Sequence, residues 1–193
     1  MSISPRQLEE RKMRQERILA GALSVFKSKG LDGATMDEIA NTSGFGKATI
    51  YYYFSSKEEV FIEIMNYGWR DLWEGIESQI ISNLKPRKKF IGIVKEIAKI
   101  VTADKVLYGF LFTAPNYIQE PKSQTWKKYQ NRLYSVLQSI IEDGIQKKEF
   151  LNINPSLLMK AIGGLFHQLL INNDDNLEDE DFELMLKNFL NPK

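Results

Sequence analysis

The sequence predicts an all-α fold in two parts, a helix-turn-helix part at residues 1–60 and a larger helical part at residues 61–193. Three observations support this prediction. Apolar residues recur at spacings of three and four along most of the chain, which is the helical period. No stretch shows the sustained alternation, bounded by turn residues, that indicates strands. The segment Thr35–Lys57 predicts a short helix, a tight turn, a second short helix and the beginning of a third.

The first helix is predicted at about residues 5–29. Ser4 can cap it, Pro5 stands where its missing N–H costs nothing, and Gln7 has the capping-box position. Gly30 predicts the end of this helix and the start of a loop, because a residue without Cβ often stops a helix. The N-terminal half of the helix carries five basic residues: Arg6, Arg11, Lys12, Arg14 and Arg17.

The predicted helix-turn-helix begins at Thr35, whose hydroxyl can accept from the backbone N–H of Glu38 three residues on. Gly44 stands where the chain must reverse and tolerates a positive φ there. In the second helix Ile50 and Phe54 are four residues apart, so we expect both to face the core. Two helices joined in this way can place the second one in the major groove of DNA.

The order and spacing of thirteen residues resemble the DNA-binding domain of the TetR family of transcriptional regulators, over about residues 14–60. These residues are Ile18, Ala22, Phe26, Gly30, Thr35, Ile39, Ala40, Gly44, Lys47, Thr49, Tyr51, Phe54 and Lys57. The chain departs from the family pattern twice. Ser43 stands where the family usually has alanine, and Gly46 stands where a serine often caps the recognition helix. Glycine is a fair N-cap, so the helix is still expected.

The resemblance implies which side chains meet DNA. Phosphate contacts are implied for Thr35, Tyr53 and Lys57. The residues implied to face the groove are Lys47, Ala48, Thr49, Tyr51 and Tyr52. The basic N-terminal half of the first helix has two interpretations, a solvated charged face or an arm that reaches DNA. Residues 1–57 hold nine Lys and Arg against six Asp and Glu, a balance of +3, while the rest of the chain has a balance of −2. That asymmetry has the sign expected for phosphate binding.

Six helices are predicted in the second part. The first is expected from Lys57 to about Leu84 with a possible break at Gly68, and the second opens at Pro86 and carries an apolar stripe as far as Ile100 or Val101. The others are expected at Lys105 (capped by Asp104) to about Tyr117, Pro121 and Ser123 to about Lys148, Asn154 to about Asn172, and Asp179 or Asp181 to about Leu190.

The second part is rich in aromatic residues. The resemblance implies an apolar effector pocket, for which the candidates are Trp69, Trp73, Phe110, Tyr117, Trp126 and Tyr129. Plain core packing is the alternative for each one. The single histidine, His167, is predicted to pack in the core or an interface rather than to bind a ligand.

Apolar stripes on the last two predicted helices suggest a dimer interface, because two helices per subunit can build a four-helix bundle across a two-fold axis. The candidates are Leu158, Ile162, Leu165, Phe166, Leu169, Phe182, Met185 and Phe189. The alternative is packing within one chain against the long helix at 123–148.

Composition excludes several classes of protein. There is no cysteine, no apolar run near ~20 residues, no apolar signal segment and no phosphate-loop or zinc-protease motif, so we expect a cytoplasmic protein without cofactor or metal. The acidic run at 174–181 lacks the glycine and spaced glutamate of a calcium loop. The resemblance implies a ligand-responsive transcriptional regulator, and by the family's habit a repressor, that binds a palindromic operator as a homodimer and is released by a small apolar effector. The alternatives are a sequence-independent DNA-binding protein and, with only scattered carboxylates for chemistry, an all-α enzyme.

Overall fold

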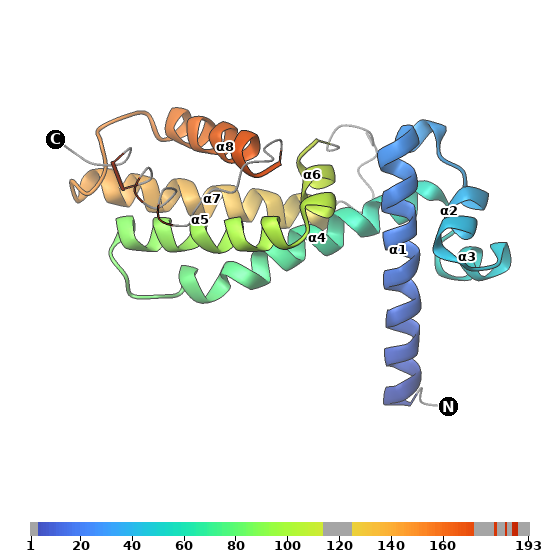
Figure 1. Ribbon diagram of the computed structural model, residues 1–193. Helices are drawn as coiled ribbons and strands as arrows, with labels where there is room; N and C mark the ends of the chain where they lie inside the picture. The colour runs from blue at the N-terminus through green and yellow to red at the C-terminus, as the bar shows by residue number, and fades with distance from the viewer. Residues whose placement is uncertain (1–3, 114–124, 172–179, 181–183, 185–186, 189–193) are drawn as a thin grey trace. The chain divides into compact units, whose positions relative to one another are not determined.

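The computed structural model describes residues 4–113, 125–171, 180, 184, 187 and 188, with side chains at all of these except 165, 166 and 168–171. Between residues 4 and 171 the described backbone forms helices and no strand (Figure 1), which confirms the all-α prediction. The helices are α1 Pro5–Gly33, α2 Met36–Ser43, α3 Lys47–Tyr53, α4 Lys57–Ile80, α5 Pro86–Ala103, α6 Lys105–Thr113, α7 Thr125–Gln146 and α8 Pro155–Ile171.

The chain divides into two compact units. The first comprises Met1–Tyr67 with Thr113–Gln124, and the second comprises Gly68–Phe112 with Thr125–Lys193. The change of unit after Tyr67 falls inside the continuous helix α4, so a helix and not a loop joins the units there. The boundary predicted after residue 60 lies earlier in the same helix.

Helix α1 begins as the sequence predicts. The Ser4 hydroxyl accepts from the Gln7 backbone N–H at 3.3 Å, and the Ser4 N–H donates to the Gln7 side chain at 2.9 Å. Its end differs from the prediction, since the helix is assigned to Gly33. Gly30 has φ +70°, which breaks the helical geometry at the predicted place, but the following residues form another helical turn. Burial of Leu31, 5% exposed, explains why the chain turns back to the core instead of forming an open loop.

The core of the first unit collects apolar side chains from four helices. Helix α1 packs on α2 and α2 packs on α3 (Figure 1). Phe26 of α1 meets Phe61 of α4 edge to face, with ring centroids 6.0 Å apart. The fully or nearly buried members of this core are Ile18, Ala22, Phe26, Ile39, Ala40, Ile50, Phe54, Val60, Phe61 and Ile64. Burial of Ile50 and Phe54, 0% and 3% exposed, confirms their predicted orientation.

In the second unit α5 packs on α7 and α8, and α7 also packs on α8. Gly68 does not break α4 as the sequence suggested. It is instead a packing glycine, because a Cβ there would lie 2.5 Å from Leu111 Cδ2 of α6. The helix also ends at Ile80 rather than near Leu84. Just after this end the Ser82 hydroxyl donates to the Gln79 carbonyl at 2.7 Å and competes with the backbone N–H groups that would continue the helix.

The predicted cap at Asp104 and the predicted helix start at Asn154 are confirmed. Asp104 accepts from the backbone N–H of Leu107 at 2.9 Å, ahead of α6. The Asn154 side chain accepts from the N–H of Ser156 at 2.9 Å and of Leu157 at 3.2 Å, ahead of α8. The predicted helix start at 121–123 and the predicted last helix from 179 or 181 fall largely outside the described residues. None of the helices that the structure describes is long and apolar enough to cross a membrane.

Candidate functional site

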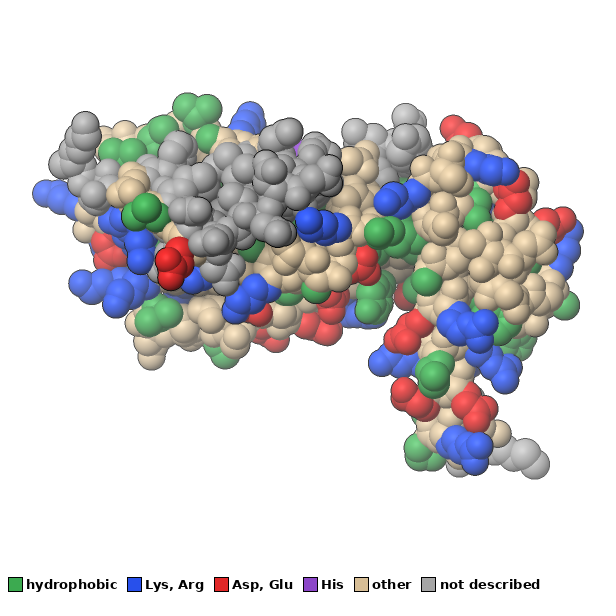
Figure 2. All heavy atoms as spheres, viewed as in Figure 1, with side chains coloured by type: hydrophobic (Ala, Val, Ile, Leu, Met, Phe, Trp, Pro, Cys, Tyr) green, Lys and Arg blue, Asp and Glu red, His purple; other side chains and the backbone are tan. Residues whose placement is uncertain are grey.

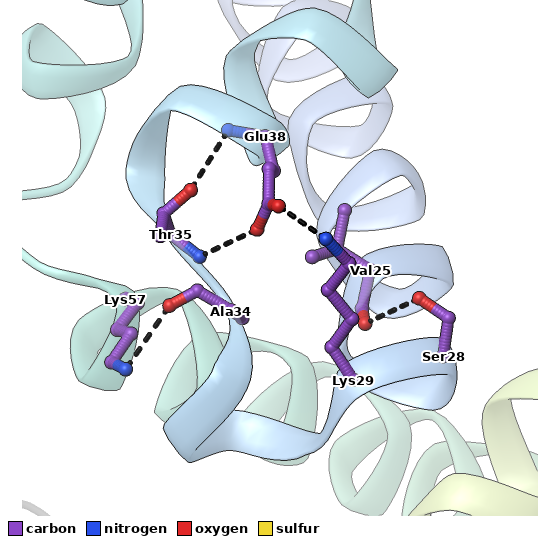
Figure 3. Close-up of polar contacts among 7 residues, drawn as sticks. All are labelled: Val25, Ser28, Lys29, Ala34, Thr35, Glu38 and Lys57. Carbon is purple, nitrogen blue, oxygen red and sulfur yellow. Dashed lines mark hydrogen bonds and ion pairs between the residues drawn. The ribbon is translucent and has the colours of Figure 1, made fainter.

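A reciprocal cap at Thr35 fixes the start of α2 (Figure 3). The Thr35 hydroxyl accepts from the Glu38 N–H at 3.2 Å, and the Thr35 N–H donates to the Glu38 carboxylate at 3.1 Å. Lys29 of α1 forms an ion pair with the same carboxylate. This hydrogen bond and those to Thr35 lower the pKa of Glu38 below its ordinary value of 4.5. The predicted capping box is therefore confirmed, and it is also connected to α1.

The turn between α2 and α3 depends on one left-handed residue. Gly44 has φ +73°, and its N–H donates back to the α2 carbonyls of Ala40 and Asn41. Ser43, just before it, is 7% exposed, and its hydroxyl donates to the Ile39 carbonyl at 2.7 Å. The departure from the family's alanine at Ser43 is accommodated in this way, because the buried hydroxyl has an acceptor.

Arg17 of α1 contacts the same turn, a role that sequence reasoning missed. Its guanidinium donates to the Ser43 carbonyl at 3.5 Å and lies 4.8 Å from the centre of the Phe45 ring. The sequence placed Arg17 only among the basic residues of the first helix. The i,i+4 periodicity of α1 could have suggested this role, since Arg17 lies four residues before the buried Gly21, which packs on Ser43.

Helix α3 presents most of its predicted contact residues to solvent. Tyr51 is 48% exposed and Tyr52 70% exposed, and Lys47 and Ala48 are also exposed. Thr49 is half-buried. Gly46 caps the helix with no side-chain hydrogen bond, as its missing hydroxyl predicts. The exposed face carries a cation, phenol groups and a small apolar residue, which are side chains able to meet phosphates and base edges.

Arg11 of α1 lies against two tyrosines of α3. Its guanidinium carbon is 5.8 Å from the centre of the Tyr52 ring and 5.9 Å from that of Tyr53. The two rings meet each other edge to face with centroids 5.3 Å apart. Tyr53 is half-buried: its ring packs against Arg11 and Tyr52, and part of the ring is exposed to solvent.

Both predicted lysine contacts already have partners. Lys47 forms an ion pair with Asp37 of α2, with a shortest N–O distance of 2.7 Å, and this contact raises the pKa of Lys47 above its ordinary value. Lys57 donates to the backbone carbonyl of Asp32 at 2.9 Å. It also donates to the backbone carbonyl of Ala34 at 3.1 Å (Figure 3). It therefore connects the beginning of α4 to the segment that precedes the exposed Thr35.

The N-terminal half of α1 is not uniformly basic. Arg6 pairs with Glu10 at 3.2 Å, and Lys12 lies 3.9 Å from Glu16, each four residues along the helix. Figure 2 shows the resulting mixture of blue and red side chains on this part of the molecule. Of the two interpretations of this segment, the pairing favours a solvated charged face for Arg6 and Lys12.

The second unit contains a cavity of about 570 Å³. Its lining comes from α4, α5, α6, α7 and α8. The lining residues are Leu72, Phe90, Val94, Ile97, Phe112, Leu133, Tyr134, Leu137, Gln138, Ser156, Met159, Lys160, Ile162, Gly163, Gly164 and His167. Partial burial raises the pKa of the Tyr134 phenol, so this hydroxyl keeps its proton and can donate.

None of the five described aromatic residues that were predicted for a ligand pocket lines this cavity. Trp69, Trp73, Phe110 and Trp126 are at most 9% exposed and belong to the packed core, and Tyr129 is half-buried elsewhere on α7. Tyr117 lies outside the described residues. Helical periodicity indicates which side chains are buried but not which buried faces border empty space, so the sequence could not distinguish lining residues from packed ones. His167, predicted to pack, lines the cavity instead.

Two of the predicted dimer residues are buried inside the single chain. Leu158 is 2% exposed and Ile162 is 7% exposed, so the alternative of packing within one chain applies to them. Their stripe on α8 faces α5 and α7 because those helices supply the nearest apolar surface. The side chains of Leu165, Phe166 and Leu169, and the whole of Phe182, Met185 and Phe189, lie outside the described part.

Comparison with known proteins gives a consistent result. The sequence profile of the family described as bacterial regulatory proteins, tetR family, matches residues 18–64. The uncharacterised HTH-type transcriptional regulator YfiR of Bacillus subtilis (strain 168) is 30% identical over 160 residues, covering 79% of this chain and 76% of YfiR. The transcriptional activator FasR of Mycolicibacterium smegmatis is 28% identical over 109 residues, covering 56% of this chain but only 49% of FasR. The crystal structure of AibR in complex with isovaleryl coenzyme A and operator DNA superposes with a TM-score of 0.80 at 19% identity, covering 93% of this chain and 98% of AibR.

Proposed function

Because the chain belongs to the TetR family of bacterial transcriptional regulators, we propose that it is a repressor controlled by a small-molecule effector. In this proposal a homodimer binds a palindromic operator and is released when an apolar effector occupies the second unit. The observation that carries the proposal is that α3 exposes Lys47, Ala48, Tyr51 and Tyr52 to solvent while its Ile50 is buried in the core.

The DNA-binding role rests on how α3 is held. Ile50 and Phe54 anchor it to the core, the Gly44 turn sets its direction, and Arg11 supports two of its tyrosines. A short helix fixed in this way can enter the major groove without losing its orientation, which recognition of base edges requires. Thr35, Tyr53 and Lys57 remain the candidates for phosphate contacts.

An operator selected from random duplex DNA tests this role. The full chain should bind the selected duplex at least ~10³-fold more tightly than random duplex of equal length. Thr49→Ala and Tyr51→Ala should remove that preference while leaving the helix content and the oligomeric state intact. Equal affinities for the two duplexes would instead support a sequence-independent DNA-binding protein. If the variants unfold, Thr49 and Tyr51 belong to the core and not to the DNA interface.

The homodimer is proposed because a two-fold operator needs two recognition helices about 34–36 Å apart. Exposed apolar side chains near the C-terminal end support it. Leu157 of α8 is 57% exposed and Leu184 is 59% exposed, an arrangement suited to burial against a partner. Sedimentation of the full chain should give twice the monomer mass. Leu157→Glu should shift the equilibrium toward the monomer, whereas Leu8→Glu, at an exposed leucine of α1, should not.

The proposed effector site is the cavity of the second unit, since concave and mostly apolar sites are typical of small-molecule binding. The AibR structure, with isovaleryl coenzyme A and operator DNA, indicates that the fold can serve both ligands in a relative. Helix α4 contributes to both units and is therefore the proposed lever. By linkage, an effector that weakens operator binding must itself bind more weakly to the DNA complex by the same factor.

A titration of the operator with and without saturating effector tests this coupling. Release requires a drop in operator affinity, and an unchanged affinity at saturation would refute effector control. A reporter gene placed downstream of the selected operator distinguishes repression from activation. Deletion of the regulator should raise expression, whereas a fall would show an activator, the activity named for the relative FasR.

A further inference from the structure

The cavity of the second unit has an apolar floor. Six of its lining residues come from α4, α5 and α7, are at most 8% exposed and carry only hydrocarbon side chains. They are Leu72, Phe90, Val94, Ile97, Leu133 and Leu137. This floor offers dispersion contacts and apolar burial but no hydrogen bond, so it suits a hydrocarbon group.

The polar lining residues stand at the more exposed side of the same cavity. Tyr134 and Gln138 of α7 and Ser156 and Lys160 of α8 are more exposed than the floor, and His167 is half-buried. Among the lining residues that the structure describes, Lys160 is the only one with a fixed charge, and none carries a carboxylate. Within the described part of the chain, the Lys160 ammonium has no ion pair or hydrogen bond. The lining therefore changes from apolar and buried to polar and cationic.

Helix α8 supplies most of this polar side. Ser156, Lys160, Gly163 and His167 follow one another at intervals of four, three and four residues, which places them on one face of the helix. A Cβ built at Gly163 or Gly164 meets no atom of the described residues within 4 Å. Open space therefore lies beside the helix between the cation and the imidazole, where a ligand group can be accommodated.

From this arrangement we propose that the cavity binds an aliphatic carboxylate, with the chain on the buried floor and the carboxylate beside Lys160 and His167. Within the described lining the ammonium has no competing anion, and the imidazole and the Tyr134 phenol supply hydrogen bonds. The volume of about 570 Å³ lies within the ordinary range for small-molecule sites. The proposal names the chemical class of the effector, and its regulatory meaning rests on the proposed function above.

Calorimetric titration of the full chain, without DNA, tests the chemistry with three probes of one chain length. Decanoate should bind about three- to tenfold more tightly than 1-decanol, because only decanoate pairs with Lys160. Decyltrimethylammonium should bind more weakly than either. The proposal is overturned if decanoate does not bind, if 1-decanol equals it, or if the cation binds most tightly.

Two pairs of variants locate the site. Lys160→Gln should remove the preference for decanoate over 1-decanol and leave 1-decanol binding unchanged, whereas Lys128→Gln, at a lysine of α7 outside the lining, should preserve both affinities. Gly163→Met should fill the open space and abolish binding of both probes, whereas Ala161→Met should not. Helix content and unfolding midpoint verify that each variant is folded. A preference for decanoate that survives Lys160→Gln would place the carboxylate elsewhere and contradict the proposal.

Operator titrations separate this proposal from the proposed function. If decanoate binds with the expected dependence on Lys160 but leaves operator affinity unchanged, the ligand chemistry is correct and effector control fails. If a neutral compound releases the operator while decanoate does not bind, effector control stands and the carboxylate proposal falls.

Discussion

In the first unit, the side chains of the candidate interface are held by direct contacts with named partners, such as Thr35 with Glu38, Lys47 with Asp37 and Lys57 with the Ala34 carbonyl. In the second unit, the candidate site is a space between side chains of five helices that are far apart in sequence. One site consists of groups that are present on a surface, and the other consists of volume that packing leaves open.

Two glycines illustrate this difference, although the second unit also has packing glycines such as Gly68. In the first unit Gly21 allows α1 to approach α2 so closely that a Cβ would lie 2.8–2.9 Å from Ser43 Cβ, Cα and N. In the second unit Gly163 faces open space. A glycine can therefore serve tight packing in one unit and an empty volume in the other, and substitution by alanine distinguishes these roles.

The largest effect is expected for Gly21→Ala. The added methyl group meets backbone atoms of Ser43 that cannot move without displacing the turn, so the variant should lose about 1–3 kcal/mol of stability. Urea unfolding followed by circular dichroism measures the loss, and operator affinity should fall with it. Gly163→Ala is the matched control and should gain about 0.5–1 kcal/mol, because alanine is the better helix former and has room. Equal effects of the two substitutions would contradict the comparison.

A smaller effect is expected for Arg17→Ala. The guanidinium stacks on Phe45 and donates to the Ser43 carbonyl, so its removal should cost about 0.5–1.5 kcal/mol and loosen the turn before α3. Amide hydrogen exchange at the turn, together with the unfolding free energy, measures this change. Arg14→Ala removes a neighbouring exposed charge and should leave both quantities nearly unchanged. If both variants bind operator equally badly with unaltered stability, Arg17 acts on DNA and not on the turn.

Asp37→Asn should act on DNA binding more than on folding. Lys47 must leave Asp37 to reach a phosphate, and an exposed ion pair of this kind is worth little, so operator affinity should rise about two- to fivefold. Asp32→Asn removes an exposed carboxylate of the same unit and should raise the affinity less. Weaker binding by Asp37→Asn would indicate that the pair holds Lys47 in its binding position.

The smallest effect is expected from Glu38→Gln, through pH. The pKa of Glu38 in the folded protein is lowered, so its negative charge stabilises the fold at pH values above its ordinary pKa of 4.5. This contribution is lost as the pH falls through the pKa that Glu38 has in the folded protein. Unfolding midpoints measured from pH 7 down to pH 3 should show wild type more stable at neutral pH and the two proteins converging in acid. A constant difference would mean that the hydrogen bonds at Thr35, and not the charge, determine the contribution.

The two units also differ in how far sequence reasoning reaches. The cap at Thr35, the turn at Gly44 and the core positions Ile50 and Phe54 were predictable, because each depends on residues within four positions of it. The contacts of Arg17 and Arg11 were not, since they depend on how α1 crosses the turn and α3.

In the second unit the helices were predictable from periodicity, but the cavity was not. Trp69 and Phe110 carry the same apolar signal as Phe90, which lines the cavity. His167 and Lys160 join the site only because α8 packs on α5 and α7 with its glycine positions facing open space. The distinction between packed and lining residues exists only in the assembled unit.

Because helix α4 is continuous across the change of unit, a chimera that joins two proteins within it must keep the helical register. Each residue inserted after Tyr67 would turn the N-terminal portion of α4 by about 100° and advance it by about 1.5 Å relative to the C-terminal portion. Chimeras that exchange the DNA-binding part with a relative should therefore function at junctions that keep the helical register. Insertions should fail at two residues and partly recover near four, so that operator spacing varies with a period of about 3.6 residues.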